Sequence, residues 1–404
     1  MPIVQRLERL SRPVTFWAIA AIIALYLAAA AAPTPLYVVY QEEWGFSATT
    51  LTLVFSVYVF GLLGSLLVLG GLSDHIGRRP LAAAAVALEV VAMVLFLLAG
   101  SVEVLAAARV VQGIATGIAL STLGAALVDL DPPDEPGLAG IVSGLAPLIG
   151  LAVGALVCGA LVEYGPMPTE LVYILVLVGL AAAAVVVARM PESSPCVPGA
   201  RASLVPRIEI PARVRPEILA MTPILVATWA LCGLYLALGP SVAAQIFKLP
   251  NHVIGGLVVA LLCGTGAITI YAMRGWGLAR SLELAAVVLA VGMALTLAGL
   301  LVEQAALAAF GAIVAGVGFG AAGRGTFGTI AAIAAPEERG GLFAAFYVIS
   351  YVAFSIPAIA AGFADTSLGL RPTAIAYGAV VLVLSLGAIW AQRRLEAQRA
   401  MVAY

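Results

Sequence analysis

The sequence predicts an all-α membrane protein with 12 transmembrane helices, and three observations lead to this fold class. Hydrophobic residues make up 63% of the 404 residues, and charged residues make up only 10%. The mean hydropathy is +1.11. Because a soluble globular chain is about half apolar and a quarter charged, the composition excludes that class. The apolar residues also fall into 12 stretches, each close to the roughly 20 residues that a helix needs to cross a bilayer.

The predicted spans follow one another at short intervals and are separated by charged, proline or glycine residues. In the first half of the chain they cover 16–40, 50–72, 80–100, 104–128, 138–162 and 169–190. In the second half they cover 218–246, 252–273, 282–302, 305–334, 341–363 and 371–391. The stretches are uniformly apolar and lack the alternation of membrane β-strands. Since a helix satisfies its own backbone hydrogen bonds in lipid, each span is predicted to be helical.

The basic residues predict the orientation of the chain. If the N-terminus lies in the cytoplasm, cytoplasmic segments hold 16 of the 20 Lys and Arg residues, as the positive-inside rule requires. The outer loops then hold only Lys248 and Arg371, while Arg109 and Arg324 lie inside predicted spans. The first span is longer than the apolar core of about 7–15 residues in a secretory signal. We therefore expect an integral plasma (inner) membrane protein with both termini in the cytoplasm.

One long connection divides the spans into six and six. Residues 191–216 are rich in Pro, Ser and Arg and predict a mobile cytoplasmic linker. This division predicts an N-terminal six-helix bundle at 1–190 and a C-terminal six-helix bundle at 217–404.

The two halves show traces of an internal duplication. The loop that starts at position 133 reads PDEPG, and 203 residues later the chain reads PEERG. At the same offset Gly154 and Gly159 are matched by Pro357 and Gly362. These matches lie at equivalent places in each half, so they predict two pseudo-symmetric bundles with a substrate site at their interface near mid-bilayer.

The loop between the second and third spans is the first candidate for a moving part. It reads GGLSDHIGRRPL from Gly70 and places Asp74, Arg78 and Arg79 at a membrane boundary, with Gly77 allowing a tight turn. Such charges can pair when one face of the protein closes and separate when it opens. The alternative is a positive-inside anchor with a turn glycine.

This spacing resembles the G-x-L-x-D-R-x-G-R-R/K signature of the major facilitator superfamily. It departs from the signature at His75, where the family usually has Arg. Asp129, at the inner end of the fourth span, is a candidate partner for Arg78 or for a helix end across the closed gate. The alternative for Asp129 is a solvated loop acid.

Arg109 lies inside the fourth span, where burial of a guanidinium in hydrocarbon costs at least about 2.5–3.5 kcal/mol. It therefore needs a partner or a wet cavity, unless it snorkels to the outer interface. Gln112 lies nearly one turn later on the same helix face. Arg109, Gln112 and Gly113 resemble the R-x-x-Q-G motif of the superfamily. The resemblance implies a role for Arg109 in proton coupling or in orienting the substrate path.

Glu89 lies at the middle of the third span, and no motif of the family accounts for it. Burial disfavours the charged form of a carboxyl group, so Glu89 is a candidate proton carrier that alternates between neutral and ionised forms. The alternative is a hydrogen-bonded structural acid.

Small residues recur in the fifth span at Gly150, Gly154 and Gly159, and such residues let helices pack closely. The run also resembles the antiporter motif G-x-x-x-G-P-x-x-G-G of the superfamily. Ala155 replaces the proline of that motif and Cys158 replaces a glycine, which weakens the implied antiport.

Arg324 lies in a glycine-rich part of the tenth span and is interpreted as a cavity-lining cation, with snorkelling or helix pairing as the alternative. The glycine string is not a nucleotide-binding loop, because no Lys-Ser/Thr follows it and no strand precedes it. Further candidates for a central cavity, each with an interfacial or packing role as the alternative, are Tyr26, Tyr37, Tyr58, Trp229, Tyr235, Gln245, Tyr347 and Tyr351.

The resemblance implies a secondary transporter that works by alternating access. No ATP-binding motif occurs in the sequence, so we expect an ion or substrate gradient to supply the energy. The antiporter-like motif and the apolar cavity candidates favour proton-coupled efflux of small organic molecules, either drugs or metabolites. The alternative is a proton symporter or uniporter that takes up sugars or organic anions, which Arg109 and Arg324 would suit.

Other classes of protein are not expected. The balance of 20 basic and 21 acidic residues, without a zinc pattern, does not favour nucleic-acid binding. An enzyme would need clustered His, Cys or acidic residues, yet the two histidines, His75 and His252, lie at membrane edges. We expect no cofactor, no metal and a monomer whose partners are lipid, protons and a small-molecule substrate. The cysteines are interpreted as small core residues; they are Cys158, Cys196, Cys232 and Cys263.

Overall fold

The computed structural model describes residues 9–335 and 338–402, and all regular elements in these residues are helices. Twelve of the helical segments are long and apolar enough to cross a membrane. The predicted fold class and the number of spans are therefore confirmed. Arg6, one of the basic residues counted in the predicted cytoplasmic segments, lies outside the described residues, as do Pro336 and Glu337 of the repeated loop.

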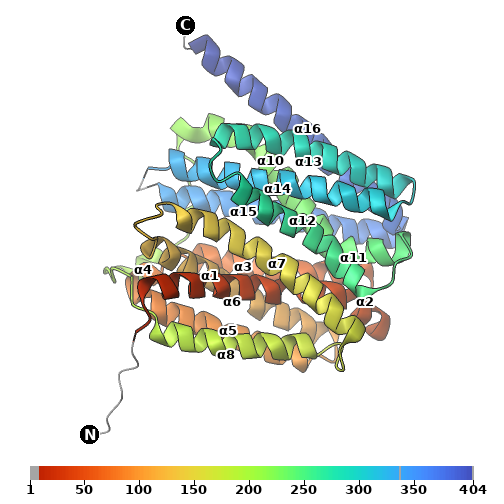
Figure 1. Ribbon diagram of the computed structural model, residues 1–404, viewed down its shortest axis with the longest axis horizontal. Helices are drawn as coiled ribbons and strands as arrows, with labels where there is room; N and C mark the ends of the chain where they lie inside the picture. Colours follow the sequence, from red (N-terminus) through yellow and green to blue (C-terminus); the bar gives the residue numbers. More distant parts are fainter. Residues whose placement is uncertain (1–8, 336–337, 403–404) are drawn as a thin grey trace.

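The first half of the chain forms one bundle, drawn below the second half in Figure 1. Its helices are α1 (Arg12–Ala31), α2 (Pro33–Trp44), α3 (Ala48–Leu69), the short α4 (Ser73–Ile76), α5 (Arg78–Leu97), α6 (Val102–Asp129), α7 (Leu138–Tyr164) and α8 (Leu171–Arg189). The predicted first span, 16–40, corresponds to α1 and α2 together, because Pro33 and Pro35 interrupt the helix near its middle.

The second half forms the other bundle. Its helices are α10 (Arg215–Ala237), the short α11 (Gly239–Ser241), the π-helical turn η2 (Val242–Ile246), α12 (His252–Ala272), α13 (Leu278–Leu301), α14 (Ala305–Ile333), α15 (Arg339–Leu368) and α16 (Leu370–Val402). A shift of 203 residues carries the long helices of the first bundle onto those of the second. For example, α3 is carried onto 251–272 and α7 onto 341–367, which nearly coincide with α12 and α15. The fold is thus a duplicated six-helix unit.

Close helix packing depends on glycine. A Cβ at Gly150 or Gly154 of α7 would clash with the backbone of α1, at Ala24 and Ala28. A Cβ at Gly159 would clash with the carbonyl oxygen of His252, on α12 of the other half. Two of the three glycines of the antiporter-like run therefore bring α1 against α7, and the third brings the two halves together.

The halves meet along two helix pairs, α7 with α12 and α3 with α15. We call the end of the molecule where α8 ends and α10 begins the linker end, and the opposite end the distal end. At the distal end the contact between α3 and α15 includes a hydrogen bond from Thr49 Oγ1 to the carbonyl of Gly362. Near the middle of the same pair, the rings of Phe55 and Phe354 stack with their centroids 5.2 Å apart.

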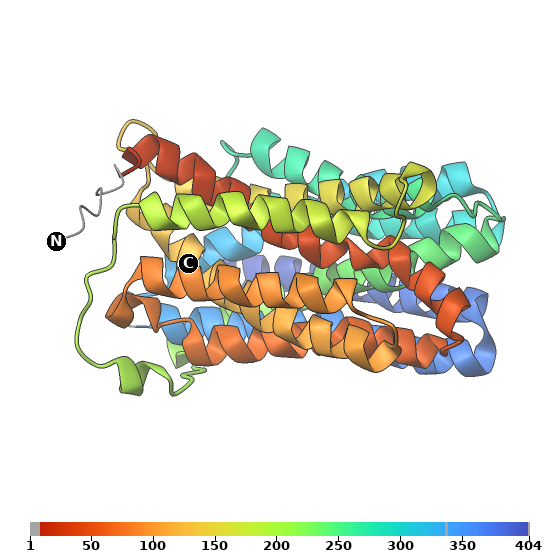
Figure 2. The same cartoon turned by 90° about the horizontal axis from the view of Figure 1, so that it is seen from below.

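The connection between the halves runs along the linker end of the bundle, from the end of α8 through α9 (Ala200–Ser203) and η1 (Ala212–Val214) to α10 (Figure 2). The sequence predicts a mobile linker, but its first part, 192–197, is hydrogen-bonded to the loop around α4. Further along, the N–H of Glu209 donates to the carbonyl of Gly341, at the start of α15. The linker therefore contacts both halves.

Candidate functional site

The predicted residues Glu89, Arg109 and Gln112 come together inside the first bundle. Glu89 lies at the middle of α5, and Arg109 and Gln112 lie nearly one turn apart on α6. All three are buried, with exposed fractions of 0–1%. We call these three residues, with the adjoining Tyr58 and Tyr26, the buried polar cluster.

Gln112 bridges the two charged residues of the cluster. Its Nε2 donates to Glu89 Oε1 at 3.2 Å, and its Oε1 accepts from Arg109 Nη1 at 2.7 Å. Glu89 and Arg109 therefore interact through an amide and form no direct ion pair within the described residues. With both residues ionised, the cluster has no net charge, and a proton on Glu89 would make it positive.

Helix α1 supplies two backbone acceptors to the cluster. Gln112 Nε2 also donates to the carbonyl of Ala29 at 3.1 Å, and Arg109 Nη1 donates to that of Ala30 at 3.0 Å. The carbonyl of Ala29 is available because the residue four positions later is Pro33, which has no N–H to donate. The proline break between α1 and α2 thus creates a binding position for the polar side chains of α6.

Aromatic rings surround the guanidinium. The Cζ atom of Arg109 lies 4.5 Å from the ring centroid of Tyr58 and 5.8 Å from that of Tyr37, both within cation–π range. Among the described residues, the buried atoms without a hydrogen-bond partner include Glu89 Oε2, Arg109 Nε and the hydroxyl of Tyr26. The cluster therefore contains a carboxylate oxygen and a hydroxyl that still have hydrogen-bonding capacity.

The second bundle has no equivalent of this cluster. At the shift of 203 residues, Gly292 stands in place of Glu89, Ala312 in place of Arg109, and Ala315 in place of Gln112. There α13 and α14 pack directly, because a Cβ at Gly292 would clash with the backbone of Ala315. The same helix pair can therefore pack in this fold without any polar side chain.

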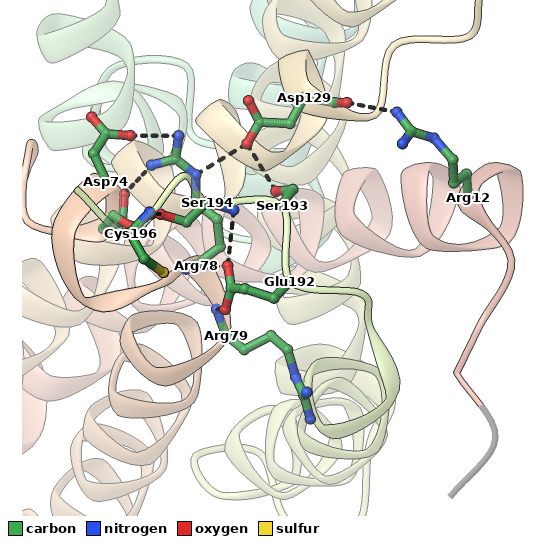
Figure 3. A network of polar contacts seen from close by, with 10 residues as sticks. Arg12, Asp74, Arg78, Arg79, Asp129, Glu192, Ser193, Ser194 and Cys196 are labelled. Atoms are coloured by element: carbon green, nitrogen blue, oxygen red, sulfur yellow. Dashed lines mark hydrogen bonds and ion pairs between the residues drawn. The ribbon is translucent and has the colours of Figure 1, made fainter.

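The loop around α4 forms a second polar site, at the linker end (Figure 3). Arg78 is buried there, and its Nη2 lies 2.6 Å from Asp74 Oδ1 while its Nε lies 3.2 Å from Asp129 Oδ2. Its Nη1 donates to Ser73 Oγ at 2.5 Å. The expected pairing of Asp129 with Arg78 is thus present, and it lies within the first bundle.

The linker supplies an acid to this site that the sequence pattern does not reveal. Glu192 accepts hydrogen bonds from the backbone N–H groups of Arg78 and Arg79, at 2.7 Å and 3.1 Å, and so caps the first turn of α5 (Figure 3). Ser193 Oγ donates to Asp129 Oδ2 at 2.8 Å. Acids favour helix N-termini, but nothing in the sequence indicates that a residue 114 positions away fills this one.

Glycines are needed where the loop turns. Gly70 ends α3, and Gly77 starts α5 with φ +106°, a backbone conformation that favours glycine. A Cβ at Gly77 would also lie 2.9 Å from Glu192 Oε2.

The second arginine of the loop points away from this site. The side chain of Arg79 turns toward α8, where its Nη2 donates to the carbonyl of Ala188 at 2.5 Å.

Three of the predicted cavity aromatics meet where the halves join. Trp229 of α10 packs on Tyr351 of α15 with centroids 5.1 Å apart, and Tyr347 stacks on Tyr351 at 6.1 Å. Trp229 also contacts Phe354, the partner of Phe55 from the first bundle. Because α3 and α15 are antiparallel, Tyr58 and Tyr351 lie one turn beyond this ring pair at similar depth. The aromatic cluster therefore adjoins the buried polar cluster through α3.

The other predicted residues lie elsewhere. The hydroxyl of Tyr235 lies 3.2 Å from Thr296 Oγ1 inside the second bundle, and Gln245 is exposed in η2 at the distal end.

Arg324 donates from Nη2 to the carbonyls of Arg274 and Trp276, at 2.8 Å and 2.9 Å. It thus holds the loop between α12 and α13. Within the described residues, no group of three or more His, Cys, Asp or Glu is placed to hold a metal ion.

Solved structures with the same arrangement of helices are membrane transporters. The human organic anion transporter MFSD10 (TETRAN) superposes with a TM-score of 0.70 at 16% identity, covering 94% of this chain and all of that chain. A bacterial homolog of the human lysosomal transporter Spinster, in an inward-facing and unoccupied conformation, superposes with a TM-score of 0.73 at 13% identity, covering 96% and 98%. The nucleoside transporter NupG superposes with a TM-score of 0.68 at 12% identity, covering 93% and 99%.

Sequence comparison points the same way. The chain is 31% identical to the MFS transporter paaT of Penicillium rubens over 122 residues, which are 30% of this chain and 22% of that protein. A family model described as Major Facilitator Superfamily matches residues 17–356. The chain therefore belongs to the major facilitator superfamily and is an integral membrane transporter, not an enzyme.

Proposed function

We propose that the protein is a proton-coupled exporter of small organic molecules, with the linker end in the cytoplasm and with Glu89 as its proton carrier. One observation supports this most strongly, namely the buried polar cluster in the first bundle at a position where the second bundle has only Gly292, Ala312 and Ala315. A buried charge that the fold does not require destabilises the protein. Its presence in one half only favours a functional role.

The cluster is built to respond to one proton. Protonation of Glu89 removes the negative charge that balances Arg109, and it turns an acceptor into a possible donor next to Gln112 Nε2. The pairing of Gln112 and Arg109 with the α1 carbonyls would then rearrange. Since such groups hold α1, α5 and α6 together, a single proton can shift the balance between two arrangements of this bundle.

The response can reach the interface between the halves through α3. Tyr58 of α3 covers the Arg109 guanidinium, and Phe55, one turn away on the same helix, stacks on Phe354 of the other half. A change in the charge of the cluster therefore acts on a helix that forms part of the interface. This is the physical link that a coupled alternating-access cycle needs.

The substrate is proposed to be apolar or aromatic. Trp229, Tyr347 and Tyr351 present rings at the junction of the halves. The two arginines within the spans, Arg109 and Arg324, already donate to backbone carbonyls. Arg109 is buried inside the first bundle and Arg324 holds the loop between α12 and α13, so neither is among the rings at the junction. This placement favours efflux of weakly charged molecules over the alternative of anion uptake. The structurally similar human MFSD10 is an organic anion transporter, which keeps organic anions as the second candidate substrate class.

Transport in proteoliposomes tests the proposal. A fluorescent apolar dye is offered with an imposed pH gradient, and its gradient-driven accumulation is compared with its gradient-free exchange. We expect Glu89→Gln to abolish the gradient-driven part and to retain exchange, because the carrier would be fixed in its neutral form. Glu103→Gln, an exposed acid in the first turn of α6, is the matched control and should behave as the wild type. Unchanged gradient-driven transport by Glu89→Gln would refute the role of Glu89.

A further inference from the structure

A polar contact between Glu163 and His252 joins the two halves at the distal end. Glu163 lies in the last turn of α7, and His252 is the first residue of α12. Glu163 Oε2 accepts from the backbone N–H of His252 at 3.0 Å and lies 2.9 Å from its Nδ1. Gly159, one turn earlier in α7, allows the two helices to approach this closely.

The duplicated fold contains the same contact a second time, with different chemistry. Thr49 near the start of α3 and Thr366 near the end of α15 place their Oγ1 atoms 2.9 Å apart. The shift of 203 residues carries Thr49 onto His252 and Glu163 onto Thr366. The two pairs are therefore pseudo-symmetric clasps between the halves, one neutral and one ionisable.

Only one of the clasps contains an imidazole, the side chain whose charge changes near neutral pH. A threonine pair keeps the same charge at every physiological pH. The imidazole of a histidine gains a proton between about pH 8 and pH 5, and a hydrogen bond between an imidazolium and a carboxylate is stronger than its neutral counterpart. Separating the halves at this end would break that contact. Because that contact is stronger with an imidazolium and exists only when the halves are joined, we expect acid to favour the joined arrangement.

The pocket that His252 lines brings no further titratable side chain to the pair. The side chains that face His252 from α2, from α11 with η2 and from the segment before α12 do not titrate; they are Pro35, Val38, Pro240, Ala244, Leu249 and Pro250. The nearest titratable residues along the chain, Tyr164, Glu170 and Lys248, are exposed. The charge of the clasp is therefore set mainly by Glu163 and His252.

We propose that Glu163 and His252 form a pH-sensitive gate at the distal end, and that acidification on that side holds this end of the transporter closed. Thr49 and Thr366 form the matching gate without pH dependence. The two gate residues position the halves and do not contact substrate. The proposal concerns the conformational cycle alone, so it stands or fails independently of Glu89 and of proton-driven efflux.

Distance measurements between spin labels test the gate without any substrate. Labels at Met167→Cys and Leu368→Cys, two exposed distal positions on opposite halves, are placed in full-length protein that lacks the native cysteines and is held in lipid nanodiscs. Distance distributions are recorded by double electron–electron resonance at about pH 8 and about pH 5.5. We expect the ratio of closed to open populations to rise about two- to fivefold at the lower pH, the range of a partly exposed ion pair.

Two variants separate the gate from other titrating groups. The double variant E163T/H252T copies the threonine clasp into the first position and should lose the pH response. The conservative variant Glu163→Gln keeps a hydrogen-bond acceptor but removes its charge, and it should lose most of the pH response. This variant keeps the test decisive if the double variant does not fold. The reverse exchange, T49H/T366E, should enlarge the response. A full pH response in either E163T/H252T or Glu163→Gln, or no response in the unsubstituted gate, would overturn the proposal.

Discussion

Glu192 Oε1 accepts the backbone N–H of Arg78 at 2.7 Å, so a linker residue caps α5, the helix that follows the loop around α4. The same carboxylate accepts from Arg79 N and Ser194 N, at 3.1 Å and 3.0 Å. The linker therefore belongs to the structure of the loop and is more than a tether between the halves. Any movement of the loop that changes the start of α5 must also break or carry these three bonds.

Removing the cap should destabilise the protein. Glu192→Ala leaves the first N–H groups of α5 without their acceptor, and loss of a helix cap costs about 0.5–2 kcal/mol. We expect a lower midpoint of thermal unfolding in detergent. Glu209→Ala, at an exposed linker position, is the control and should change the midpoint little. Equal midpoints for the two variants would contradict the capping role.

Gly77 should not tolerate a side chain. Its φ of +106° is strained for any residue with a side chain. A Cβ at this position would also lie only 2.9 Å from Glu192 Oε2. Forcing such a backbone conformation costs on the order of 1–3 kcal/mol. Gly77→Ala is therefore expected to unfold at a lower temperature, whereas Gly140→Ala, which meets no atom within 4 Å, should be neutral or slightly stabilising. Stability equal to that of Gly140→Ala would show that the turn can relax.

Gln112 should matter for both stability and transport. Gln112→Leu removes the donor to Glu89 Oε1 and the acceptor for Arg109 Nη1, and an unsatisfied buried polar group costs about 1–3 kcal/mol. We expect a lower unfolding midpoint together with weaker gradient-driven dye accumulation in proteoliposomes. Gln304→Leu, an exposed residue before α14, is the matched control. Normal stability and transport in Gln112→Leu would show that the bridge is dispensable.

The ion pair between Arg213 and Glu338 should make a small, pH-dependent contribution to stability. The Arg213 guanidinium holds the pKa of the Glu338 carboxyl below its ordinary value of 4.5. A lowered pKa in the folded state means that the contribution is present above the ordinary value and is lost as the pH falls through the folded-state value. The loss of thermal stability between about pH 7 and about pH 3 should therefore be smaller in Glu338→Gln than in the wild type, and added salt should reduce the difference. An identical acid response in both proteins would count against the pair.

The local part of the candidate site was predictable from the sequence. Arg109 and Gln112 share a helix face because they are three residues apart, and this relation holds in any bundle. Asp129 is a candidate partner of Arg78 from the sequence because both lie where a span ends on the same side, although the sequence does not exclude a solvated loop acid. The 12 spans were predictable for the same kind of reason, since the length of an apolar stretch depends on the chain alone.

The remaining contacts depend on how the helices are rotated and which helices are neighbours. The spans are apolar on all sides, so hydropathy does not indicate which face of α5 carries Glu89 toward Gln112. Glu192 reaches α5 only because the linker folds back along the bundle, and Arg324 reaches backbone carbonyls only because the loop after α12 lies beside α14. Composition and spacing thus determined the spans, the duplication and the short-range pairs. Packing between helices far apart in the chain determined the buried polar cluster and the two clasps, because close approach through small residues selects the partners.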